Sequence, residues 1–190
     1  MALANKIIII TAPSGAGKTS ITRHLMHTFP QLAFSVSAAT RQARGTEKDG
    51  VDYHFMSEEK FNEKIQHNEF IEWEMVYQGK YYGTLKSELD KIWAENKIPV
   101  LDIDVKGAIH VKKQYPDSAL TIFIDPPSVE ELRNRLESRG TENAVAITAR
   151  VNKATYEISF KNDFDKIVVN DNLQKACIEA DAIVKEFISQ

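Results

Sequence analysis

Four consecutive isoleucines at 7–10 run directly into TAPSGAGKTS at 11–20, and this junction limits the possible folds more than any other feature. The β-branched run predicts a strand over 6–11 that is covered on both faces, as in a parallel sheet. An amphipathic pattern predicts a helix over 17–28. A glycine-rich turn between a buried strand and a helix N-terminus lets backbone amides converge on phosphate oxygens.

The same alternation of short apolar runs with helical patterns continues along the 190 residues. Further strands are expected at 33–36, 98–103, 119–124 and 166–169. Further helices are expected at 84–95, 105–114, 128–138 and 172–188, the third opened by a capping box of Ser128 and Glu131. Strands that alternate with helices predict a right-handed, doubly wound, three-layer α/β fold around a parallel sheet.

Two stretches interrupt this alternation. Residues 35–83 contain Asp-Gly at 49–50 and Gln-Gly at 78–79 among aromatic segments, which predicts hairpins in a small antiparallel lobe. Residues 126–155 open with two prolines and are rich in arginine, which predicts a charged helical lid. We therefore expect a single domain over 1–190 whose core comprises 1–34, 84–125 and 156–190.

Composition excludes several classes of protein. A net charge of −3 shows no basic footprint for nucleic acid, so acidic ligands must be met by local clusters of cations. The N-terminal apolar block is too short for a signal peptide, and no run reaches the length of a membrane helix. Cys177, the only cysteine, lies in a helical apolar pattern and is expected to pack in the core. We expect a cytoplasmic protein without membrane or nucleic-acid partners.

The stretch APSGAGKT at 12–19 matches the phosphate-loop pattern G-x-x-x-x-G-K-[ST] except that Ala12 replaces the first glycine. An alanine there would be strained if the position required a positive φ. Lys18 would place a cation at the transferring phosphate, and Thr19 would offer a hydroxyl to Mg²⁺. The alternative is a glycine-rich turn without a ligand. The residues predicted to bind ATP in this loop are Ala12, Pro13, Ser14, Gly15, Ala16, Gly17, Lys18 and Thr19.

A GTPase is one interpretation of such a loop. DVKG at 104–107 has the D-x-x-G form of a nucleotide switch after a strand. Guanine recognition in GTPases usually depends on N-K-x-D, and the three Asn-Lys pairs at 5, 96 and 152 all lack the aspartate. The GTPase interpretation therefore fails on its most specific motif.

The predicted lobe is better suited to a small phosphorylated acceptor. Arg41 and Arg44, with Glu47 and Tyr53 close by in sequence, suit a dianionic phosphate monoester. A carboxylate such as Glu72 can accept two parallel hydrogen bonds from guanine, whereas adenine has no such pair of donors on that edge. Buried polar recognition of this kind can discriminate by roughly 10⁴ or more.

These stretches, together with LDIDVKGA, FIDPPSVEELRNRLESRGT and VNDN, resemble the guanylate kinase family, which phosphorylates GMP from ATP. The resemblance implies that guanine is read by Ser37, Glu72 and Thr84. It implies that the GMP phosphate is held by Arg41, Arg44, Tyr53 and Tyr82, with Glu47 in the same stretch and Asp102 bordering the pocket. It also implies catalytic arginines at Arg44, Arg139 and Arg150, and an adenine nucleotide near Arg135, Asn170 and Asp171. The chain departs from the family pattern at Ala12, Ala43, Gly45 and Lys106.

Several of these residues also have simpler interpretations. Arg135 follows Glu131 by four residues, so a surface ion pair explains it as well as ATP does. Asp104 can be a helix N-cap or can reach Mg²⁺ through water. The loop arginines can pair with Glu47 or Asp49, Arg150 can be solvated, and Glu72 can face either solvent or a ligand cleft.

The sequence thus predicts Mg²⁺-dependent transfer of the γ-phosphoryl group of ATP to GMP or dGMP, a reaction of purine nucleotide metabolism. Two rivals are a binding module of the same fold that recognises protein ligands, and a kinase acting on another phosphorylated acceptor. The retained phosphate loop and arginines oppose the first, and Glu72 with Ser37 opposes the second.

Overall fold

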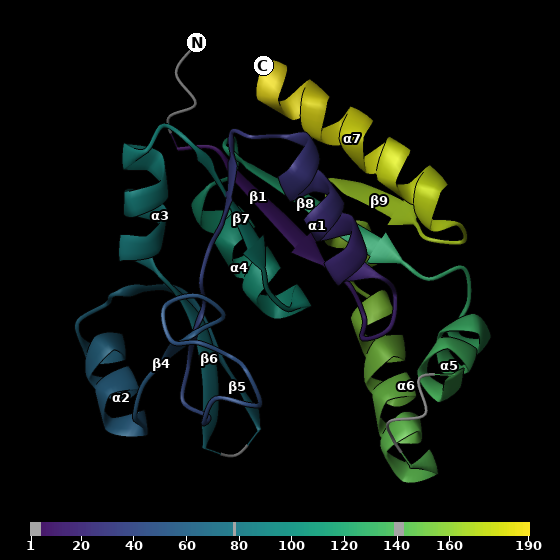
Figure 1. Ribbon diagram of the computed structural model, residues 1–190, viewed down its shortest axis with the longest axis horizontal. Coiled ribbons are helices and arrows are strands. Elements are labelled where there is room, and N and C mark those ends of the chain that lie inside the picture. The colour runs from purple at the N-terminus through teal and green to yellow at the C-terminus, as the bar shows by residue number, and fades with distance from the viewer. Residues whose placement is uncertain (1–4, 78, 139–142) are drawn as a thin grey trace.

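The computed structural model describes residues 5–77, 79–138 and 143–190, and its centre is a parallel sheet (Figure 1). Five strands lie in the order β2-β7-β1-β8-β9, and every neighbouring pair is parallel. The strands are β1 (Ile7–Thr11), β2 (Leu32–Phe34), β7 (Ile98–Asp102), β8 (Ala119–Asp125) and β9 (Lys166–Val169). The predicted α/β fold is confirmed, and the predicted strand ends are correct to within two residues.

Helices cover both faces of this sheet. One face carries α1 (Lys18–Thr28) and α7 (Leu173–Ser189), and the other carries α3 (Lys86–Ala94) and α4 (Val105–Gln114). The four isoleucines of β1 explain how one strand serves both faces. Ile8 and Ile10 belong to the first core cluster, whereas Ile7 and Ile9 belong to the second. Successive side chains of a strand point to opposite faces, so both faces are apolar.

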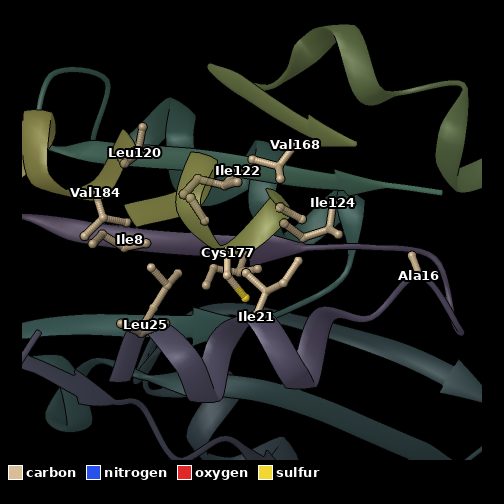
Figure 2. Packing of buried hydrophobic residues seen from close by; sticks show 14 of the residues in the cluster. Ile8, Ala16, Ile21, Leu25, Leu120, Ile122, Ile124, Val168, Cys177 and Val184 are labelled. Carbon is tan, nitrogen blue, oxygen red and sulfur yellow. The ribbon is translucent and has the colours of Figure 1, made fainter. Parts of the chain in front are cut away.

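The core on the α1 side is shown in Figure 2. Ile21 and Leu25 of α1 pack against β1, and Cys177 and Val184 of α7 lie in the same cluster. Cys177 is buried there, and burial raises the pKa of its thiol. The prediction that this cysteine packs in the core is confirmed.

A second, smaller sheet forms the lobe, with the order β4-β3-β6-β5. Its elements are β3 (Ala38–Ala39), β4 (His54–Phe55), α2 (Glu58–Gln66), β5 (Phe70–Tyr77) and β6 (Lys80–Leu85). The predicted antiparallel lobe is wrong in one respect, because β3 and β4 pair in parallel. The chain from β3 to β4 therefore crosses over instead of forming a hairpin at Asp49-Gly50, whereas β5 and β6 do form the predicted antiparallel pair.

Helix α2 was not anticipated, although its signals are present in the sequence. The Ser57 hydroxyl accepts a hydrogen bond from the Lys60 amide, which caps the helix, and Phe61 lies buried in the lobe core. The aromatic residues around α2 favour strands, and in the sequence this strand propensity outweighs the helix signal of the Ser57 cap.

The predicted lid contains α5 (Val129–Ser138) and α6 (Ala144–Ile158), followed by a 3-10 turn, η1 (Lys161–Asp163). The Ser128 hydroxyl accepts from the Glu131 amide at 3.0 Å, which confirms the predicted start of α5. In Figure 1 the lobe and α5–α6 extend from the same end of the sheet, away from the two chain termini. None of the helices within the described ranges combines the length and apolarity needed to cross a bilayer.

Candidate active site

A cleft of about 490 Å³ opens where the phosphate loop, the ends of β1 and β7, the lobe and α6 meet. The carboxyl ends of parallel strands are the usual position of a ligand site in such folds. The cleft is lined by Ala12, Pro13, Ser14, Gly15, Gly17, Lys18, Thr19, Ser20, Ser37, Tyr53, Glu72, Glu74, Val76, Tyr82, Gly83, Asp102, Ile103, Asp104, Lys153 and Glu157.

The phosphate loop has the backbone geometry that its glycines predict. Gly15 and Gly17 both have φ of +98°, a region that residues with a side chain rarely enter. Gly17 is the N-cap of α1, and the first residues of that helix, Lys18, Thr19 and Ser20, line the cleft. Ala12 does not adopt a positive φ, so the alanine at this position causes no backbone strain.

Asn170, at the end of β9, braces this loop. Its side-chain amide donates to the carbonyl of Ala16 at 2.7 Å, and the residue is buried. A β-carbon on Gly17 would collide with the same amide group. Gly17 is therefore required both for its φ and for the close approach of Asn170.

Lys18 and Asp102 join the loop to the neighbouring strand. The Lys18 ammonium forms an ion pair with the carboxylate of Asp102, and both side chains retain partial exposure to the cleft. This contact holds the lysine at the wall of the cleft. The next residue of the loop, Thr19, is exposed and lines the same cleft.

On the lobe, Arg41 lies behind two aromatic rings of the cleft wall. Its guanidinium carbon is 4.7 Å from the centroid of the Tyr53 ring, and its Nε donates to the Tyr82 hydroxyl at 3.1 Å. Nη1 and Nη2 donate to the two oxygens of Glu47 at 2.5 and 2.8 Å. This bidentate pair lowers the pKa of Glu47 to about 2, helped by a hydrogen bond from the Arg44 amide. The pKa of Arg41 is raised, first by the same Glu47 bond.

Glu72 of β5 is a buried carboxylate that lines the cleft. It is 7% exposed, and its Oε1 accepts from the Thr84 hydroxyl of β6 at 2.6 Å. Burial raises its pKa to about 7, and the Thr84 hydrogen bond opposes that shift only in part. The structure thus places Glu72 in the cleft and excludes a solvated surface position.

Comparison with known proteins agrees with this geometry. The family model described as guanylate kinase matches residues 4–189. The chain belongs to the guanylate kinase family. Guanylate kinase of Bacteroides thetaiotaomicron is 46% identical over 188 residues, which covers 99% of this chain and 92% of that protein. Guanylate kinase of Porphyromonas gingivalis is 47% identical over 186 residues and covers 97% and 99%.

The fold comparison points the same way. The crystal structure of guanylate kinase from Anaplasma phagocytophilum superposes with a TM-score of 0.78 at 28% identity. That alignment covers 98% of this chain and 88% of the other.

Some of the residues implied by the guanylate kinase resemblance do not form the wall of the cleft. Thr84 is buried and is not part of the lining, and its hydroxyl donates to Glu72, which does line the cleft. Arg44 is exposed on the loop, and its described hydrogen bonds are made by its backbone: the amide donates to the Glu47 carboxylate, and the carbonyl accepts from the Glu47 amide. Asp171 is exposed and accepts from the Asn172 amide.

The lid arginines are placed in different ways. Arg135 donates to Glu131 at 2.9 Å, one helical turn earlier, as the ion-pair interpretation predicts. Arg150 donates to the Ser14 hydroxyl of the phosphate loop at 3.1 Å, which connects α6 to the donor side of the cleft. Arg139 lies outside the described residues.

Asp104 lies at the start of α4. Its side chain accepts from the Gly107 amide at 2.8 Å, so the N-cap interpretation is confirmed. It also lines the cleft together with Thr19. Among the described residues no group of three or more His, Cys, Asp or Glu side chains could hold a metal ion.

Sequence reasoning missed three charged residues that line the cleft, although it predicted others on the same elements. Lys153 and Glu157 of α6 line it and form an ion pair at 3.7 Å, and Glu74 lines it from β5. Burial raises the pKa of Glu157. The spacing of these two residues from Arg150, three and seven positions, would have placed them on its helix face.

Proposed function

We propose that this chain is a guanylate kinase that transfers the γ-phosphoryl group of ATP to GMP and dGMP, giving ADP and GDP or dGDP. The observation that carries the proposal is a single cleft that joins a phosphate loop to a buried carboxylate. Lys18 lies on one wall and Glu72 on another. A donor triphosphate and a guanine acceptor can therefore meet in one site.

On the donor side, the amides of the loop and of the first turn of α1 would bind the β- and γ-phosphates of ATP. Asn170 would keep the loop in shape by its bond to Ala16. Arg150, already bonded to Ser14, would extend cationic charge toward the triphosphate. Arg135 and Asp171 would lie closer to the adenine end.

On the acceptor side, Glu72 would accept the ring imino hydrogen and the exocyclic amine of guanine. The Thr84 hydroxyl occupies one lone pair of Oε1 and leaves the others for the base. Ser37 lines the same cleft and would complete recognition of the base. Arg41, Tyr53 and Tyr82 would hold the GMP phosphate, with Glu47 fixing the orientation of the guanidinium.

The acceptor is already an anionic phosphate oxygen, so no strong general base is required. Catalysis would come from in-line positioning of the reactants and from positive charge at the transferring group. Lys18, Arg44, Arg139 and Arg150 would supply that charge. Closure of the lobe and lid would exclude water and prevent hydrolysis of ATP.

The residues of this cleft fit Mg²⁺ that arrives with ATP. Mg²⁺ commonly keeps several waters and binds substrate phosphates with few protein ligands. The Thr19 hydroxyl and, through water, the Asp104 carboxylate would hold it, and both line the cleft. When bound, the ion neutralises phosphate charge. Because ATP and GMP are cytoplasmic metabolites, we place the protein in the cytoplasm.

The test is ADP release from Mg-ATP with a panel of acceptors. We expect turnover with GMP and dGMP, and discrimination of roughly 10⁴ against AMP and CMP. A Lys18→Met variant serves as the control, because it removes the loop cation and should abolish ADP release. Turnover with another monophosphate but not with GMP would overturn the assignment of the acceptor, and absence of any turnover would overturn the activity.

A further inference from the structure

Gly107 is a glycine that the backbone does not require. It lies in the first turn of α4, is buried, and has no left-handed φ. Glycine is among the poorest helix formers, because it loses more conformational freedom than alanine when it becomes helical. A glycine in this position therefore needs a reason from packing.

The reason is the carboxylate of Glu72. A β-carbon on Gly107 would lie 2.8 Å from Glu72 Oε2 and 3.4 Å from Glu72 Cδ. The first distance is shorter than real contacts of this kind. Oε2 therefore occupies the space that a side chain on Gly107 would fill, while Oε1 is held by Thr84 at 2.6 Å.

The backbone of Gly107 does not itself bind this carboxylate by a described hydrogen bond. Its amide donates to Asp104, the N-cap of α4, at 2.8 Å. What the glycine provides is room for Oε2 beside the first helical turn.

We propose that Gly107 is a positioning residue for guanine specificity, because only a residue without a side chain lets Glu72 keep both oxygens fixed between β6 and α4. This inference rests on the proposed function. It also accounts for the glycine of DVKG, the motif that superficially resembled a GTPase switch.

The test is a Gly107→Ala variant. Alanine favours the helix, and the clashing atom is the end of a flexible side chain, so the variant should fold with a melting temperature no lower than the parent. Loss of one hydrogen bond to a charged group should raise KM for GMP by about 10-fold or more with little change in kcat. IMP lacks the exocyclic amine and should be affected less, so the preference for GMP over IMP should fall. His110→Ala, on the exposed side of α4, is the control and should behave as the parent.

A double variant with Glu72→Asp separates direct contact from general damage. Shortening the acid withdraws the oxygen from the added methyl group, so the two changes should not multiply. We expect KM for GMP in the double variant at least about 3-fold below the product of the single effects. An unchanged KM and GMP-to-IMP preference in Gly107→Ala, or fully multiplicative effects, would overturn the inference. A parent chain without GMP turnover would instead overturn the proposed function.

Discussion

Replacing Glu72 by glutamine should make the ligand-free protein more stable at pH 8 while it removes GMP recognition. The carboxylate is buried, and its pKa in the folded chain is about 7 against an ordinary value of 4.5. Between these two values the folded chain binds more protons than the unfolded chain. The free energy of unfolding of the parent therefore falls as pH rises through this window.

The difference between these two pKa values corresponds to about 3 kcal/mol in the free energy of unfolding, and about 2–3 kcal/mol of it is lost between pH 5 and pH 8. Glutamine keeps the shape of the side chain and can still accept from Thr84. Glutamine does not ionise, so the free energy of unfolding of the variant does not fall in this way as the pH rises. Removal of two charge-assisted hydrogen bonds to guanine should lower kcat/KM for GMP by about 10² to 10⁴.

The measurement is urea unfolding of both chains without nucleotide at pH 5 and pH 8. The difference in unfolding free energy between variant and parent should be larger at pH 8. Glu63→Gln, which alters an exposed carboxylate of α2, is the control and should follow the parent. A difference that is the same at both pH values would refute the reasoning, since it would show that burial of the charge carries no cost.

Three further predictions concern the loops and the lid. Gly17→Ala should lower stability by about 1–3 kcal/mol and raise KM for ATP, because it adds backbone strain and a clash with Asn170. Gly50 also has a positive φ, but no atom lies within 4 Å of an added β-carbon, so Gly50→Ala adds backbone strain without a clash and should leave KM for ATP unchanged. Glu47→Gln should raise KM for GMP by about 10-fold, since it weakens the bidentate pair with the loop guanidinium, and an unchanged KM would contradict this role. Arg139→Ala should lower kcat by about 10³ while GMP affinity stays the same, and a loss confined to KM would count against catalysis.

Local sequence determined the elements of this protein well. The strand, loop and helix over 7–28, the cap at Ser128 and the cap at Asp104 all depend on residues within one or two turns of each other. Such signals are decided by backbone conformation and by nearby hydrogen bonds, so they can be recognised without the fold. The resemblance of successive motifs then led to the family.

Pairing across long stretches of chain was decided only by the tertiary structure. In the lobe sheet β4 lies beside β3 and parallel to it, so Asp49-Gly50 belongs to a crossover connection although its local sequence favours a hairpin. Lys18 meets Asp102 across 84 positions, and Asn170 meets Ala16 across 154. No local pattern identifies such partners.

The same distinction applies to charge and space in the cleft. The sequence alone determined that a carboxylate stands at position 72 between two apolar residues. Its pKa near 7 and its fit against Gly107 follow from burial between β6 and α4. Desolvation and steric room depend on every element packed around a group, and those elements come together only when the chain has folded.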